Sequence, residues 1–267
     1  MKLLFTDLDG TLLNNESKVS TGTKAFLDEF LEAGNKLILS SGRPLNSVLE
    51  VARDAGLTQS GILFICNNGT LVYDRDNQKP ILEKRLSRKY VSYLQHKAHE
   101  HGIHIQTYTD NQIVCAKEDE EVKYYRRKIH LDLLLAEDYA SFLPKEPYKM
   151  LMIELHNPEK LNRFCEDIAD WGKDKIQAIF SSDIYLELFD KNAGKGNAVR
   201  FVCDYFGVPL TDAYAAGDAE NDISMLEAAG VGIAMANGTD AVKNAADVIT
   251  ELDNDKDGLA QMMRKLL

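Results

Sequence analysis

The sequence has few cysteines, and they form no pattern typical of a metal site or of a disulfide framework. Cys66, Cys115, Cys165 and Cys203 are the only four in 267 residues, with no C-x-x-C pair and no cysteine–histidine spacing typical of zinc. Scattered cysteines of this kind favour buried, reduced thiols and a reducing compartment. A small secreted domain held by disulfides is therefore not expected.

Positive charge and long apolar runs are also scarce. The 31 Lys and Arg residues against 42 Asp and Glu residues give a formal net charge of -11, and no basic cluster stands out. Affinity for nucleic acid comes from clustered Lys and Arg, so a general nucleic-acid partner is not expected. No run approaches the ~18 apolar residues of a membrane span, and the stretch between Lys2 and Asp7 is too short for a signal-peptide core. We therefore expect a cytoplasmic protein with no membrane partner.

Short apolar runs alternate with helical patterns at both ends of the chain. In the first quarter, such runs occupy residues 3–6, 36–41 and 62–66, separated by helical spacing in residues 21–33 and 44–55. The last quarter repeats the pattern, with strands expected at 213–216, 231–234 and 248–250 and helices at about 219–229 and 239–246. Continuous apolar strands joined by helices predict a parallel sheet covered on both faces.

The middle of the chain has a different pattern. Residues 103–108 and 113–116 alternate around the turn Asp110-Asn-Gln, and residues 150–155 precede a helical pattern at 158–171. Hairpins combined with helices indicate a separate α+β domain inserted into the parallel one. We therefore expect an α/β core domain made of residues 1–83 and 190–267, interrupted by a second domain of residues 84–189.

Two aspartates follow the first expected strand, in the segment LLFTDLDGTLL. Asp7 and Asp9 stand at i and i+2, so both would project from the carboxyl end of that strand, where open α/β sheets bind ligands. Two carboxylates this close repel unless one keeps a proton or a cation lies between them. A solvated turn explains the pair about equally well. A calcium loop does not, because Leu12 and Lys18 occupy its glycine and glutamate positions.

Three further segments place polar side chains where expected helices begin. In SSGR, the Ser41 hydroxyl and backbone N–H groups could bind an anion, although an ordinary helix cap is the commoner meaning. In GDAEND, Asp218 and Asp222 could face one point with Asn221 beside them, which is more acid than one helix cap needs. In NAGKGNA, Lys195 begins a helix and could face an anion or, as surface lysines more often do, solvent.

Two other segments look like metal sites but have simpler interpretations. Residues 253–258, DNDKDG, imitate half of a calcium loop, but Arg264 occupies the position of the required glutamate. We interpret this segment as a loop that caps the last helix. The histidines of the middle domain are interrupted by a glycine and have no tight metal spacing, so we expect solvated imidazoles at His96, His99, His101 and His104.

Taken in order, DLDGT, the hydroxyl of SSGR, a lysine at a helix start and GDAEND resemble the motifs of the haloacid dehalogenase-like hydrolases. The insert after the third strand and its Asn67-Asn-Gly69 turn is similar to the C2B cap of the Cof-type subfamily IIB. The resemblance implies a Rossmann-like core, with a parallel sheet flanked by helices, plus an inserted α+β cap that selects the substrate. Two small departures are Ser41, where threonine is frequent, and Gly194, where serine is common.

The resemblance also implies Mg²⁺-dependent phosphoryl transfer. Asp7 would be the nucleophile that forms an aspartyl-phosphate, and Asp9 would protonate the leaving alcohol and then activate water. The metal ligands would be the Asp7 carboxylate, the Asp9 carbonyl, Asp218 and, directly or through water, Asp222. The phosphate oxygens would be bound by Gly10, Ser41, Gly42, Lys195 and Asn221, with Arg43 as a candidate substrate contact.

From the resemblance we expect a phosphatase of small phosphorylated metabolites, with sugar phosphates as the favoured class, acting as a monomer or weak homo-oligomer. A phosphomutase of the same superfamily is one alternative. A non-catalytic sensor of a phosphorylated ligand is another, although binding alone requires neither a nucleophile nor an acid. No motif that would select a leaving group is recognisable in the middle domain.

Overall fold

The computed structural model describes residues 1–127, 129 and 131–267, and the chain divides into two compact units. One unit consists of residues 1–83 and 194–267, and the other of residues 84–193. The sequence predicts that the inserted domain ends at residue 189, whereas the second unit of the structure ends at residue 193. The first unit is thus interrupted in sequence by the second.

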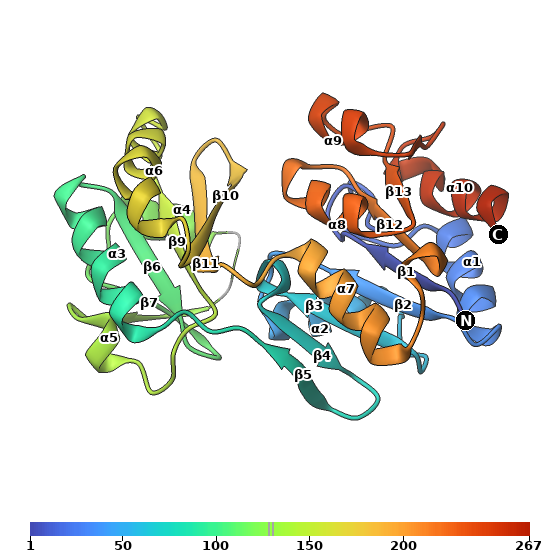
Figure 1. Ribbon diagram of the computed structural model, residues 1–267, viewed down its shortest axis with the longest axis horizontal. Helices are drawn as coiled ribbons and strands as arrows, with labels where there is room; N and C mark the ends of the chain where they lie inside the picture. Colours follow the sequence, from blue (N-terminus) through green and yellow to red (C-terminus); the bar gives the residue numbers. More distant parts are fainter. Residues whose placement is uncertain (128, 130) are drawn as a thin grey trace. The chain divides into compact units, whose positions relative to one another are not determined.

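The first unit is built on one sheet with the strand order β14-β13-β12-β1-β2-β3-β4-β5 (Figure 1). The parallel strands are β1 (Leu3–Thr6), β2 (Lys36–Ser40), β3 (Ile62–Cys66), β12 (Ala213–Gly217), β13 (Val231–Ala234) and β14 (Val248–Ile249). The parallel α/β sheet expected from the sequence is confirmed. An antiparallel hairpin, β4 (Leu71–Asp74) and β5 (Lys79–Glu83), extends it at one edge and was not expected.

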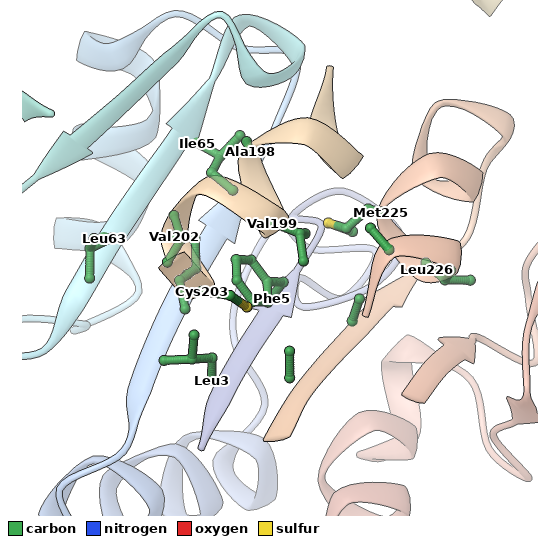
Figure 2. Close-up of a cluster of buried hydrophobic side chains, with 14 of the residues drawn as sticks. Leu3, Phe5, Leu63, Ile65, Ala198, Val199, Val202, Cys203, Met225 and Leu226 are labelled. Carbon is green, nitrogen blue, oxygen red and sulfur yellow. The ribbon is translucent and has the colours of Figure 1, made fainter. Parts of the chain in front are cut away.

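Helices cover both faces of this sheet. On one face, α7 (Lys195–Phe206) and α8 (Ile223–Ala228) pack over the side chains of Leu3 and Phe5 (Figure 2). Leu4 points to the opposite face and is also fully buried. The remaining helices of this unit are α1 (Thr21–Glu32), α2 (Leu45–Asp54), α9 (Asp240–Ala245) and α10 (Gly258–Leu266). Because α1 contacts β2 and α2 contacts β3, these apolar strands are enclosed between helices.

The second unit is an α+β domain with the strand order β10-β11-β9-β6-β7-β8. Its strands are β6 (His104–Tyr108), β7 (Gln112–Cys115), β8 (Asp132–Leu135), β9 (Lys149–Ile153), β10 (Ile176–Ser182) and β11 (Tyr185–Asp190). Its helices are α3 (Arg88–Glu100), α4 (Glu120–Arg126), α5 (Tyr139–Phe142) and α6 (Glu159–Gly172). Residues of α3 and α6 pack on one face of the sheet against Ile105 and Met152. Among the helices of the described residues, none is long and apolar enough to cross a membrane.

One of the four histidines is buried, contrary to the expectation, and His101 is half-buried beside Asp167. His96 and His99 are exposed, but His104 is 8% exposed and its two ring nitrogens hydrogen-bond with Asp119, at 2.8 Å, and with Gln106. The prediction of a solvated imidazole is therefore wrong for His104. The reason is that His104 begins β6 inside the sheet, where α4 starts beside it, so the ring is enclosed.

Candidate active site

Asp7 is the first residue beyond β1, and its side chain is buried. Its backbone N–H donates to the carbonyl of Ala216 at 2.9 Å, which continues the pairing of β1 with β12. Its carboxylate Oδ1 accepts a hydrogen bond from Lys195 Nζ at 2.6 Å. Burial raises the pKa of the Asp7 carboxyl to about 8; Lys195 opposes this shift, and Asp222 adds to it. Asp7 is thus a carboxylate held at the carboxyl end of β1 by a buried cation.

Asp9 lies in a different environment from Asp7, because β1 ends at Thr6 and the chain turns immediately afterwards. Gly10, at φ +81°, makes this turn, and a Cβ there would lie 2.5 Å from Asp218 Oδ2. The exposed Asp9 carboxylate accepts two hydrogen bonds from Arg43, at 2.9 and 2.7 Å. Strand alternation therefore does not place the two acids on one side: Asp7 faces the buried lysine and Asp9 faces Arg43.

Lys195 begins α7 and is 1% exposed, so the surface interpretation of this lysine is wrong. Its ammonium donates to Asp7 Oδ1 and Asp222 Oδ1, both at 2.6 Å, and to the carbonyl of Ser40 at 3.2 Å. Burial alone would lower the pKa of Lys195, but Asp222 and Asp7 more than offset that effect and raise it. The lysine is therefore a permanent positive charge between two carboxylates.

A close contact between two glycines determines where α7, and with it Lys195, begins. Gly69, at φ +90°, ends the short 3₁₀ turn η1 (Asn67–Gly69), and a Cβ there would lie 2.3 Å from the carbonyl oxygen of Gly194. The backbone N–H groups of Asn67 and Asn68 donate to the carbonyls of Arg43 and Ser41. This turn therefore connects the SSGR segment to the start of α7.

Asp218 and Asp222 follow β12 and have separate contacts. Thr11 Oγ1 donates to Asp218 Oδ1 at 2.8 Å. Burial raises the pKa of Asp218 to about 6; the bond from Thr11 opposes this shift and Asp222 adds to it. Asp222 is fully buried, and its Oδ2 accepts the N–H groups of Asp218 and Ala219 at 3.1 and 3.2 Å. A 3₁₀ turn, η3 (Glu220–Asp222), stands where the sequence predicted continuous helix, and α8 begins after it.

Three carboxylates at this edge form a group that could hold a metal ion. Oxygen atoms of Asp7, Asp218 and Asp222 lie within 4.8 Å of one another. Oxygen donors suit a hard divalent cation such as Mg²⁺ or Ca²⁺. Three carboxylates face one ammonium here, that of Lys195, so a divalent cation would balance the remaining negative charge. The residues present therefore fit a divalent metal.

Several of the expected phosphate-binding residues are sequence neighbours of residues in these contacts. Ser41 is 3% exposed, and its Oγ accepts the N–H of Arg43 at 3.1 Å. Its own backbone N–H donates to the carbonyl of Ile65, which holds it at the end of β2. Gly42 follows Ser41, and Asn221 precedes Asp222 in η3. The contacts described above connect Lys195 with Asp7 after β1, with Ser40 at the end of β2 and with Asp222 after β12.

Three residues at this edge were not singled out from the sequence. Thr11 contacts Asp218 through its hydroxyl, and Ser40 contacts Lys195 through its carbonyl. Asn237 Nδ2 donates to the carbonyl of Gly10 at 2.7 Å. Two of them carry a sequence signal that could have found them. Thr11 belongs to the DLDGT motif, and Asn237 follows the end of a strand, β13.

Comparisons with known proteins cover almost the whole chain. The model of the haloacid dehalogenase-like hydrolase family matches residues 4–263. A Bacillus subtilis protein named 5-amino-6-(5-phospho-D-ribitylamino)uracil phosphatase YwtE is 26% identical over 300 residues, covering 100% of this chain and 98% of its own. A haloacid dehalogenase-like hydrolase from Bacteroides thetaiotaomicron superimposes with a TM-score of 0.86 at 28% identity, covering 100% and 99% of the two chains. The sugar phosphatase BT4131, of HAD subclass IIB, shares the fold with a TM-score of 0.82 at 24% identity, covering 100% and 99%.

Proposed function

The chain belongs to the haloacid dehalogenase-like hydrolase family, and from that premise we propose that it is a Mg²⁺-dependent phosphatase of small phosphorylated metabolites. The observation that carries the proposal is the contact of Lys195 with both Asp7 and Asp222, each at 2.6 Å, beside Asp218. This contact joins a candidate nucleophile, a buried cation and a set of metal ligands in one centre.

In the proposed reaction, Asp7 attacks the phosphorus atom, the bond to the leaving oxygen breaks, and an aspartyl-phosphate forms. Lys195 contacts Asp7 Oδ1 and stays charged, so it favours the ionised carboxylate that the attack requires. The same ammonium is close enough to the reacting centre to attract the phosphate dianion. Water then hydrolyses the intermediate and releases inorganic phosphate.

Metal binding is assigned to the Asp7 and Asp218 carboxylates and the Asp9 carbonyl. When bound, Mg²⁺ supplies positive charge that offsets the negative charge developing on the transferred phosphoryl group. Asp222 acts behind this shell, because its two oxygens already accept bonds from Lys195 and from the N–H groups of Asp218 and Ala219. We assign to Asp222 the placement of Lys195 and of the loop that carries Asp218.

Asp9 is the proposed general acid and base. Its two oxygens both accept bonds from the guanidinium of Arg43, which favours the ionised carboxylate, so this pair must loosen for Asp9 to carry the proton that it delivers to the leaving oxygen. The negative charge of an arriving substrate offers Arg43 a second partner. We therefore assign Arg43 two roles. In the free enzyme it pairs with Asp9, and in the substrate complex it contacts the substrate.

Phosphate binding is assigned to Gly10, Ser41, Gly42, Lys195 and Asn221. The Ser41 oxygen accepts the N–H of Arg43, which leaves the hydroxyl proton for a phosphate oxygen. Residues 84–193 are the proposed cap that selects the leaving group. We propose sugar phosphates and related phosphorylated polyols as substrates. The name of the Bacillus subtilis relative supports this class, since its substrate carries phosphate on a ribityl chain.

The direct test is the variant Asp7→Asn with p-nitrophenyl phosphate as substrate. The amide cannot attack phosphorus, so we expect kcat to fall by at least ~10³-fold while the circular dichroism spectrum is unchanged. EDTA should abolish the wild-type activity, and added Mg²⁺ should restore it. An Asp7→Asn variant that keeps more than a tenth of the wild-type rate would rule out the aspartyl-phosphate route.

Substrate class requires a wider comparison. We expect kcat/KM to be highest for sugar phosphates in a panel that also contains nucleotides, pyridoxal phosphate and flavin mononucleotide. A preference for a non-sugar would replace the substrate class and leave the mechanism in place. Isomer formation without release of phosphate would indicate a phosphomutase. Wild-type protein that binds but does not hydrolyse any member of the panel in Mg²⁺ would indicate a sensor.

A further inference from the structure

The segment of residues 253–257 precedes α10 but does not cap it in the way the sequence suggests. Asp257 occupies the N-cap position, yet its side chain makes no capping bond to any described residue of α10. The Asp257 carboxylate instead accepts the N–H of Thr23, at 2.8 Å, and the hydroxyl of Ser20, at the start of α1. The helix that this acid caps is thus α1, more than two hundred residues away in sequence.

Two asparagines from the C-terminal part of the chain make similar long-range contacts closer to the proposed reaction centre. Asn254 is 8% exposed, and its Nδ2 donates to the carbonyl of Leu13 at 2.8 Å. Its backbone N–H donates to Asn237 Oδ1 at 3.2 Å, and Asn237 Nδ2 donates to the carbonyl of Gly10 at 2.7 Å. We call Asn237 and Asn254 the asparagine clamp. They hold both ends of residues 10–13, the loop that follows Asp9.

The loop has little conformational restriction of its own at Gly10. Glycine populates many backbone conformations, so contacts must select the one at φ +81°. Because a peptide group is planar, holding the Gly10 carbonyl also orients the N–H of Thr11 on the same plane and limits where the Thr11 side chain can point. That side chain donates to Asp218 at 2.8 Å. The clamp therefore acts on a residue that contacts a proposed metal ligand.

We propose that Asn237 and Asn254 are positioning residues of the phosphoryl-transfer site, which hold residues 10–13 so that Asp9 and Thr11 keep their places beside Asp7 and Asp218. The inference rests on the proposed function and adds two residues from the C-terminal part of the chain to it. Asn237 is exposed, so its substitution should change stability little, and a loss of kcat/KM in its variants would then report on positioning. A merely structural clamp would affect stability and leave kinetics unchanged.

The test compares variants of the clamp with a neighbour in the same segment. Asn237→Ala removes both side-chain bonds, whereas Asn237→Asp keeps the oxygen that binds the N–H of Asn254 and loses the donor to Gly10. We expect both to lower kcat/KM by about 10- to 100-fold, mainly through kcat, and to raise the half-activating Mg²⁺ concentration. The control is Asp255→Ala, which removes the two bonds to the exposed Asn15, leaves the bonds of Asn237 and Asn254 in place, and should stay within twofold of wild type.

Amide hydrogen exchange of residues 10–13 provides a readout that does not depend on activity. We expect exchange at these amides to be about tenfold faster in Asn237→Ala and Asn254→Ala than in wild type, and unchanged in Asp255→Ala. If Asn254→Ala does not fold, because the Leu13 carbonyl is left buried without its donor, the two variants of the exposed Asn237 decide the question.

Two results would overturn the inference. One is wild-type kcat/KM and wild-type exchange in both Asn237 variants, and the other is an equal loss of kcat/KM in Asp255→Ala. If wild-type protein releases no phosphate from any substrate, the proposed function fails separately. Exchange then decides the clamp alone: faster exchange in the Asn237 variants supports it, and unchanged exchange overturns it.

Discussion

Lys195 and Arg43 are two cations at one edge of the sheet, and their different exposure gives them different physical roles. Lys195 is fully buried between Asp7 and Asp222, so its removal would leave two buried carboxylates without a counter-charge. Breaking a buried ion pair in this way costs about 3–5 kcal/mol. Arg43 and Asp9 are 35% and 55% exposed in their side chains, and pairs of that kind contribute ~1 kcal/mol or less. We therefore expect the Arg43 pair to matter for reactivity more than for stability.

The variant Arg43→Ala tests this separation at the scale of one residue. We expect its melting temperature to stay within about 2 °C of wild type, since the pair is exposed to water, while kcat/KM for the preferred substrate falls roughly tenfold. Arg43→Lys should recover only part of the loss, because an ammonium cannot bind both oxygens of Asp9 as a guanidinium does. Wild-type kinetics combined with a large fall in melting temperature would show that the pair is structural.

At the scale of elements, the contact between η1 and the start of α7 determines the position of the buried Lys195. Gly69 packs directly on the backbone of Gly194, so the turn and the helix can approach only because no side chain lies between them. The same turn binds the backbone of the SSGR segment through Asn67 and Asn68. A displacement of this turn would therefore affect both Ser41 and Lys195.

Gly69→Ala should be strongly destabilising, and Gly34→Ala is its matched control. Both glycines have positive φ, +90° and +80°, but a Cβ at Gly34 meets nothing within 4 Å. The left-handed backbone alone costs about 1–2 kcal/mol, and overpacking at Gly69 adds about 1–3 kcal/mol. Urea denaturation should show this difference. Activity should fall only in Gly69→Ala, and equal stability of the two variants would contradict the packing argument.

For the whole molecule, the net charge of -11 opposes the approach of a phosphate, so the positive charge that binds it must be local. The ammonium of Lys195 is one such charge, and a metal ion held by Asp7 and Asp218 would be another. Without metal, burial raises the pKa values of Asp7 and Asp218 to about 8 and about 6, above the value of 3.8 for an ordinary aspartate. The metal-free folded state therefore binds more protons than the unfolded state between about pH 4 and pH 8.

This difference has a definite sign for stability. Because the folded state holds the extra protons, the free energy of unfolding of the EDTA-treated protein should fall as pH rises from 5 to 8. Divalent metal binds the ionised carboxylates, so the rise in melting temperature caused by Mg²⁺ should be larger at pH 8 than at pH 5, by several degrees. Thermal unfolding with EDTA and with Mg²⁺ measures both trends. A metal-free protein that becomes more stable over this range would contradict the assignment, and Asp7→Asn should weaken the trend.

Most of the core fold could be predicted from local patterns, because continuous apolar runs and helical spacing are properties of neighbouring residues. The antiparallel β4–β5 edge was missed because Pro80 and the exposed residues around it carry no clear strand signal. The continuous helix expected at residues 219–229 is interrupted because the side chain of Asp222 bonds back to the preceding turn. Thr11 and the asparagine clamp were missed because their partners lie far away in sequence.

By itself, the sequence determined that Asp7, Ser41 and Asp218 stand at the carboxyl ends of parallel strands, because each lies at the end of an apolar run or within two residues of it. Only the tertiary structure decided which groups meet there. Lys195 reaches Asp7 across 188 residues of chain because α7 packs on β1, and Arg43 reaches Asp9 across 34. The physical reason is that a strand end is set by its neighbours in the chain, whereas a hydrogen bond between distant residues exists only after their elements have packed.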